Sequence, residues 1–366
     1  MLKQLCAREA YRPFFLVFPL IGAAALAGWV GGLRGHLALG PTDHAAAMIW
    51  GVLGLAVLGF LGTAYPRQND AAPPSPALLS GALALALATT LAWAAAWMGA
   101  PTRGLVAALG ATLWAGVWVW ATRIAWGTLR RRWDGTTAAV PLALGAGLAG
   151  WIEVGWGSDP RLGVALGLHP FLIGLALALL DRLLPFFCSK AVPGYSGTRK
   201  PGFAVSLLPL LLLRALAWGP IALWDAALLL LLIRQAVGWR IDQGLRTPMV
   251  AVLILGVGWL GLGYAAELVL GPGPAPTHLW TVGGLGTLVL GISTRVTRGH
   301  GGLPVALDRW TGLALALLQA ATLLRVVPAL TGAQGLGTWS AAAAALGLAW
   351  TIWWVRHARL LTRSGA

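Results

Sequence analysis

Charged residues are scarce in this chain of 366 residues, where they make up 10% of the total and hydrophobic residues 58%. About a quarter of a typical soluble protein is charged, so this composition excludes an ordinary soluble globule. The apolar residues also occur in blocks of roughly 20, the length of helix that crosses about 30 Å of hydrocarbon. The sequence therefore predicts an all-α polytopic membrane protein surrounded by the lipid bilayer.

Cysteine and the common catalytic motifs are also lacking. The two cysteines, Cys6 and Cys188, form no C-x-x-C pair, and both are expected on the cytoplasmic side, where thiols stay reduced, so a structural disulfide is not expected. No Walker A loop, H-E-x-x-H, G-x-S-x-G or C-x-x-C-H motif occurs. Phosphoryl transfer, zinc proteolysis, serine hydrolysis and covalent attachment of c-type haem therefore have no support.

Proline, glycine and charge clusters divide residues 1–366 into twelve predicted helices that form a single transmembrane domain. The helices are expected at residues 14–33, 44–65, 77–99, 104–126, 137–156, 162–184, 203–219, 221–239, 248–270, 277–294, 310–330 and 337–356. No gap between them is long enough for a separate soluble domain.

Acidic residues number only 11, against 26 basic ones. Such an excess would suggest nucleic acid in a soluble protein, but here the basic residues lie in short segments between apolar blocks. With twelve helices, 21 of the 26 fall on the side of the N-terminus, and the opposite loops hold only Arg34, Arg103 and Arg161. Cytoplasmic loops carry the excess of Lys and Arg, so both termini are expected inside and no nucleic acid partner is expected.

A few ionisable residues fall within the predicted spans, where each charge costs roughly 2.5–3.5 kcal/mol or more. His44 opens the second helix, His169 lies in the outer third of the sixth, and His278 opens the tenth. Five charged residues are expected at a similar depth, toward the non-cytoplasmic face: Glu153, Arg214, Asp225, Glu267 and Arg325. These side chains are the best candidates for a functional site.

The three histidines recur at intervals of 125 and 109 residues, and each interval spans four helices. A stretch rich in glycine and leucine follows each one, which indicates three pseudo-repeated four-helix units. Imidazoles from two helices can hold haem iron from both faces, and Arg214 and Arg325 lie at a depth where they could pair with haem propionates.

Each of these features also has a simpler interpretation. A histidine at a helix start can be an interfacial residue, and the two arginines can neutralise Glu153, Asp225 or Glu267 in structural ion pairs. His300 lies in a flexible Gly-His-Gly-Gly segment that could approach a ligand, although the segment also resembles an ordinary helix stop. His36 and His357 are expected to be solvated.

Four segments resemble the NnrS family of multi-span membrane proteins. They are Tyr11-Arg12-Pro13-Phe14-Phe15-Leu16, His44 through Pro66, Arg182-Leu-Leu-Pro185-Phe186-Phe187, and His278-Leu-Trp-Thr281-Val282-Gly283 running into Thr294-Arg295-Val296-Thr297-Arg298-Gly299-His300. The last is the most specific, since it resembles an H-x-x-T-V-G…R-V-x-x-G-H pattern. The resemblance implies a protein of the bacterial inner membrane that contains haem and copper and is linked to nitric oxide stress and denitrification.

The sequence departs from the family at the second helix. The family usually has H-x-H-E-M there, whereas this chain has His44-Ala45-Ala46-Ala47-Met48 and so lacks the second histidine and the glutamate. The resemblance therefore implies b-type haem more strongly than copper.

A weaker, architectural resemblance is to the catalytic subunits of haem-copper oxidases. These also have twelve helices in three arcs, with haem ligands on helices 2 and 10 and a copper histidine in an H-P motif on helix 6. His44, His278 and His169-Pro170 match these places, but the histidine pair expected on helix 7 is absent from residues 203–219.

The resulting hypothesis is a haem protein in which His44 and His278 hold haem near the outer face, with His169 and His300 as further candidate metal ligands. Its ligand would be nitric oxide or a related small redox molecule, with a redox partner or a second copy of the chain as a candidate partner. Two alternatives are a transporter or carrier that has an outer-facing polar site and no haem, and a membrane sensor or assembly factor.

Overall fold

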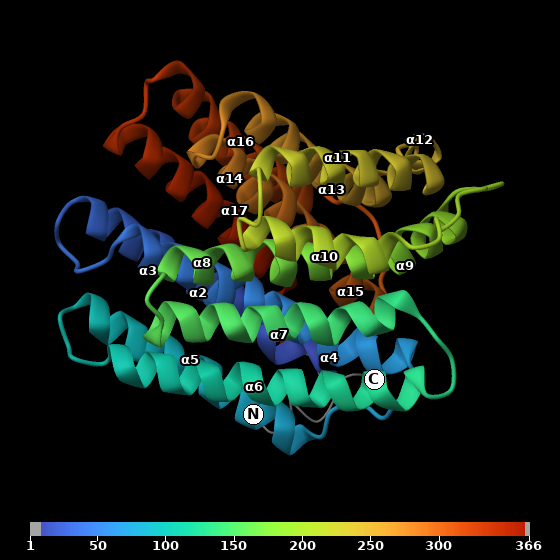
Figure 1. Ribbon diagram of the computed structural model, residues 1–366, viewed down its shortest axis with the longest axis horizontal. Coiled ribbons are helices and arrows are strands. Elements are labelled where there is room, and N and C mark those ends of the chain that lie inside the picture. Colours follow the sequence, from blue (N-terminus) through green and yellow to red (C-terminus); the bar gives the residue numbers. More distant parts are fainter. Residues whose placement is uncertain (1–8, 363–366) are drawn as a thin grey trace.

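The computed structural model describes residues 9–362, which form helices and no strand (Figure 1). The prediction for Cys6, and the cytoplasmic placement predicted for the basic residues Lys3, Arg8 and Arg363, lie outside these residues. The helices are α2 (Tyr11–Leu33), α3 (Pro41–Ala46), η1 (Ala47–Leu53), α4 (Gly54–Gln68), α5 (Pro76–Trp97), α6 (Arg103–Leu129), α7 (Gly135–Trp156), α8 (Pro160–Leu166), η2 (Gly167–Ile173), α9 (Gly174–Ala191), α10 (Phe203–Ala215), α11 (Ile221–Gly238), α12 (Ile241–Gly244), α13 (Pro248–Leu270), α14 (Pro274–His278), η3 (Leu279–Gly286), α15 (Thr287–His300), α16 (Arg309–Thr331) and α17 (Leu336–Thr362).

Ten helices of the described chain are long and apolar enough to cross a membrane. They include three composite helices, α3–η1–α4, α8–η2–α9 and α14–η3–α15, each of which runs without interruption. The other two predicted spans correspond to α10, which has only 13 residues, and to α17, which has 27 and is not among the ten. The prediction of a multi-span helical membrane protein is confirmed, while twelve crossings and cytoplasmic termini stay predictions.

Proline begins five helices of the described chain; α13 starts at the predicted residue 248, and the other four start earlier than the sequence predicts. The first residues of α3, α5, α8, α13 and α14 are Pro41, Pro76, Pro160, Pro248 and Pro274. Proline suits this position because its fixed φ is already helical and the backbone N–H that it lacks would have no partner there. Prolines that were interpreted as breaks between spans therefore lie inside the first turn.

The segments η1, η2 and η3 are π-helices, in which the hydrogen bonds run from residue i to residue i+5. They occur in the three composite helices, which carry His44, His169 and His278. The same unusual local structure thus recurs in the three helices in which the sequence places the recurring histidines.

The composite helices also form the centre of the molecule. In the most apolar 18-residue stretch of each composite helix, 78%, 78% and 67% of the residues are buried. The corresponding values for the other seven spans are 28–56%. A Cβ at Gly167 would lie 2.5 Å from the ring of Trp50, so glycine is what allows η2 to approach η1. The ring of His169 in η2 packs edge-on against that of Trp280 in η3, with centroids 4.9 Å apart.

The first and last described helices close the bundle by packing against each other (Figure 1). Arg12 of α2 donates to the carbonyl oxygen of Leu360 in α17 at 3.2 Å. The helix α17 continues past the predicted end at residue 356, and it carries His357 into the interior, where the side chain is fully buried. The prediction that His357 is solvated was wrong, whereas His36 is exposed as expected.

Candidate functional site

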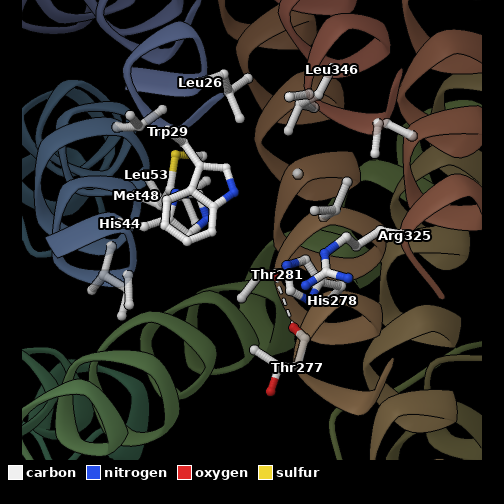
Figure 2. A pocket seen from close by; sticks show the side chains of 18 of the residues that line it. Leu26, Trp29, His44, Met48, Leu53, Thr277, His278, Thr281, Arg325 and Leu346 are labelled. Atoms are coloured by element: carbon white, nitrogen blue, oxygen red, sulfur yellow. Dashed lines mark hydrogen bonds between the residues drawn. The ribbon is translucent and has the colours of Figure 1, made fainter. Parts of the chain in front are cut away.

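A cavity of about 330 Å³ lies between the first halves of the three composite helices and the helices α2, α16 and α17. Figure 2 shows Trp29, His44 and Met48 on one wall and Thr277, His278, Thr281 and Arg325 on the other. Most of the remaining lining is apolar and includes Leu26, Ile49, Val52, Leu53, Leu168, Val282, Leu346 and Trp350. Apolar walls with a few convergent polar groups are typical of a cofactor or small-molecule site.

His44 is positioned by the first turn of α3. Asp43 accepts a hydrogen bond from the backbone N–H of Gly40 at 3.0 Å and pairs with Arg103 at 2.8 Å, which fixes the start of the helix. The imidazole stacks on Trp29 of α2, with centroids 4.3 Å apart and an interplanar angle of 26°. Neither ring nitrogen of His44 has a hydrogen-bond partner among residues 9–362. The ring is therefore oriented by stacking, and its nitrogens stay available.

His278 ends α14 and is held by a hydrogen bond. Its Nδ1 lies 2.7 Å from the carbonyl oxygen of Pro274. A carbonyl can only accept, so Nδ1 carries the proton and Nε2 carries the lone pair. This is the arrangement in which a second group fixes the tautomer and orientation of a metal-binding imidazole.

Arg325 of α16 brings a positive charge to the same cavity. Its guanidinium lies 5.6 Å from the ring of Trp339, and its NH1 atom is buried without a hydrogen bond. Within the described chain no carboxylate lies within 4 Å of it. A guanidinium without a carboxylate partner suits an anionic group on a ligand, because Arg binds carboxylates through paired N–H donors.

His169 and Arg214 lie elsewhere, in a buried cluster that does not line the cavity. Arg214 of α10 pairs with Asp225 of α11 and with Glu267 of α13, and its NH1 lies 2.6 Å from Nε2 of His169. The structure thus separates the predicted site residues into two groups. His44, His278 and Arg325 meet at the cavity, whereas His169, Arg214, Asp225 and Glu267 form an ion-pair network like the one weighed as the simpler interpretation of Arg214.

The remaining polar residues predicted near the outer face make local contacts. Glu153, near the end of α7, accepts a hydrogen bond from the backbone N–H of Asp159 at 2.7 Å. It therefore stabilises the loop that leads into α8. Among the residues described, no group of three or more His, Cys, Asp or Glu side chains has the arrangement of a metal site.

Sequence reasoning missed the aromatic and thioether side chains of the cavity. Trp29 lies in the last two turns of α2, and Met48 follows His44 by one turn of helix. The spacing of Met48 from His44 was a usable signal, because residues four apart share a helix face. Trp29 had no such signal among the 21 tryptophans of the chain.

The family model for the NnrS protein matches residues 6–364. The chain belongs to the NnrS family. The match covers nearly the whole sequence, and it supports a general assignment as a membrane protein associated with haem or metal and linked to nitric oxide stress. No curated protein matches the chain.

Segments that carried the resemblance to the NnrS family pack against each other. The backbone N–H of Tyr11 donates to the hydroxyl of Thr63 at 3.0 Å. A Cβ at Gly59 would lie 2.9 Å from the ring of Phe15, so glycine is needed where α4 crosses α2. Arg295 lies 3.9 Å from the ring of Phe187. These contacts account for much of the resemblance as packing between α2, α4, α9 and α15.

In this NnrS-family chain His300 lies with those segments and does not line the cavity. Its Nδ1 is 3.4 Å from Glu9, its Nε2 is 3.3 Å from Arg67, and its ring centroid is 5.2 Å from that of Tyr11. Both ring nitrogens therefore face protein groups. The structure does not bring His300 together with His44 or His278.

Proposed function

We propose that the cavity binds b-type haem, which His44 and His278 would hold, and that the protein serves nitric oxide handling or the electron transfer linked to it. The observation that carries the proposal is the arrangement of the histidines, which reach one apolar cavity from two different helices. The hydrogen bond from Nδ1 of His278 to Pro274 leaves Nε2 free to bind a metal.

The rest of the lining fits haem as well. Leucine, isoleucine and valine side chains suit the apolar face of the macrocycle, and Arg325 supplies a cation for a propionate. When bound, haem held by two histidines would supply one-electron redox chemistry, and a diatomic ligand would have to take the place of one of them. The part of the chain itself is to hold the group, to orient the two imidazoles and to keep water from the apolar wall.

His169, Arg214 and His300 are not part of the proposed haem site. Arg214 faces Nε2 of His169, and a guanidinium has no lone pair to accept a hydrogen bond, so Nε2 is the acceptor and Nδ1 carries the proton. The lone pair that a metal would use is thus occupied. Copper is not assigned either, because Ala46 and Ala47 stand where the family pattern has the second histidine and the glutamate.

Absorbance spectroscopy of the protein purified from membranes tests the haem site. We expect a Soret band in the wild type, a weaker and shifted band in His44→Ala and in His278→Ala, and no band in the double variant. His36→Ala is the matched control, because His36 lies in an exposed loop, and it should retain full haem content. A Soret band that survives in the double variant, or the lack of a band in the wild type, would contradict the proposal.

The same measurement distinguishes the haem proposal from the alternative of a transporter or carrier without haem. That function predicts no cofactor in any variant, and it predicts that Arg325→Met alters binding of an anionic solute. Under the haem proposal Arg325→Met retains His44 and His278, and we expect it to lower haem affinity without changing the shape of the spectrum, which depends on the two histidines.

A further inference from the structure

The buried cluster around Arg214 joins four elements of the bundle. The guanidinium uses Nε for Asp225 of α11, NH2 for Glu267 of α13 and NH1 for His169 of η2. All four side chains are nearly inaccessible, with Asp225 at 0%, His169 at 4%, and Arg214 and Glu267 at 6% exposure. Every charge in this cluster is therefore removed from water.

The formal charges of the cluster do not balance. Arg214 contributes one positive charge, and Asp225 and Glu267 contribute two negative charges when both are ionised. His169 adds no charge, because its Nε2 accepts from Arg214 and its ring is therefore the neutral tautomer. The ionised cluster would carry a net charge of −1 inside the membrane, which is strongly unfavourable.

The neighbouring elements supply no second cation. Tyr264 of α13 and Trp280 of η3 place their rings against Arg214, with centroids 5.9 and 4.8 Å from the guanidinium carbon. His278 and Arg325 on α14 and α16 face the cavity. Charged residues of α7 and α9 have other partners. Glu153 accepts a hydrogen bond from the backbone N–H of Asp159, Asp181 pairs with Arg199, and Arg182 pairs with Asp134. No other Lys or Arg of the described chain lies within 4 Å of Asp225 or Glu267.

Polar atoms without hydrogen-bond partners also indicate that the cluster lacks one positive charge. Oδ2 of Asp225, Nδ1 of His169 and the hydroxyl of Tyr264 are buried and have no hydrogen-bond partner. A carboxylate oxygen with no donor at zero exposure is costly, whereas the hydroxyl of a protonated carboxyl is much less so. Oδ2 of Asp225 is therefore the most favourable place for a proton in this cluster.

We propose that the Arg214 cluster is an intramembrane proton-binding site, in which the carboxyl pair Asp225 and Glu267 holds one exchangeable proton. Arg214 neutralises one carboxylate, and the proton neutralises the other. Loss of this proton to a base leaves both carboxylates ionised. Arg214 lies beside both of them, which limits the cost of that charged state. The site involves neither His44 nor His278, so it does not depend on haem.

Infrared difference spectroscopy of the purified full-length protein in detergent, without added haem, tests this site through the absorption of protonated carboxyl groups. We expect the wild type to show the signal of one buried carboxyl group at neutral pH, and we expect this signal to shift in deuterated water and to disappear at high pH. Asp225→Asn and Glu267→Gln should each abolish the signal, because one carboxylate then balances Arg214. Arg214→Gln should double it, because neither carboxylate then has a cation.

Asp181→Asn is the matched control. Asp181 is also a buried carboxylate, but Arg182 and Arg199 balance it and Asp134. The substitution should leave the signal unchanged. Asn and Gln keep the shape of the acids they replace, and size-exclusion elution of Asp225→Asn and Glu267→Gln verifies that both are folded. The proposal is overturned if the wild type gives no such signal, or if the signal persists in both folded variants.

Discussion

Neutralising the two acids of the Arg214 cluster separately and together should reveal their dependence on each other. In Asp225→Asn one ionised carboxylate still faces Arg214, so the substitution exchanges a neutral acid for a neutral amide of the same shape. The same holds for Glu267→Gln, because the remaining acid then gives up its proton. In the double variant no carboxylate remains, and Arg214 stays buried at 6% exposure without a counter-charge.

The size of the effect follows from these contacts. Each single substitution alters about one hydrogen bond, which costs about 1 kcal/mol. The double substitution removes every ionic partner of a buried charge, and breaking a buried pair in this way costs about 3–5 kcal/mol. The double variant should therefore lose about 1–3 kcal/mol more free energy of unfolding than the two single variants together, which is within the range of coupling between residues in contact.

Unfolding by titration with a denaturing detergent, followed by circular dichroism, gives these differences for the four members of the cycle. Glu153→Gln combined with Asp225→Asn is the control, because Glu153 bonds to the backbone of Asp159 outside the cluster. That pair should be additive. If Asp225→Asn and Glu267→Gln are additive too, or if either single change costs as much as the double one, the inference of one shared proton is refuted.

Two further predictions concern other parts of the bundle. The carboxylate of Asp308 bonds to Arg298, Thr311 and Arg356; burial raises its pKa, but the hydrogen bonds from Thr311 and Arg356 outweigh this and lower the pKa to about 2. Because its pKa is lowered, Asp308 stabilises the fold above the unfolded value near 4, and this contribution is lost as the pH falls toward 2. Asp308→Asn should therefore cost about 2 kcal/mol of unfolding free energy at pH 7, and its unfolding free energy should fall less steeply than that of the wild type between pH 7 and 2. An equally steep fall in the variant and the wild type would contradict this. Deleting Ala47 from η1 should convert the π turn to an α turn and abolish the Soret band, while loss of the loop residue Ala72 should not; haem content that is equal in the two deletions would show that the π turn does not position the site.

The membrane spans were the most predictable part of the fold. Apolar length and charge placement identify them, because the cost of burying polar groups in hydrocarbon leaves few alternatives. The helix ends were less predictable, since a proline can either end one helix or begin the next. At Pro274, for example, a Gly-Pro cluster that indicated a break contains the first residue of α14.

His357 shows how charge can hide a buried face. The basic residues Arg356 and Arg359 suggested a solvated tail, but Trp350, Trp353, His357 and Leu361 are all buried on one side of α17. Their spacing of three or four residues is that of a helix face. Nδ1 of His357 lies 2.8 Å from the carbonyl oxygen of Trp353, so the ring is held within its own helix. The periodic signal was present in the sequence, and net charge was the poorer guide.

The partners of the three recurring histidines could not be predicted, because they depend on the position of each π turn. His44 lies three residues before η1, His169 is the third residue of η2, and His278 directly precedes η3. Each residue turns an α-helix by about 100°, and a π turn holds an extra residue, so these offsets direct the three side chains differently. His44 and His278 reach the cavity, whereas His169 contacts Arg214. Recurrence along the sequence therefore predicts that the histidines lie on related helices, and the π turns determine which of them share a site.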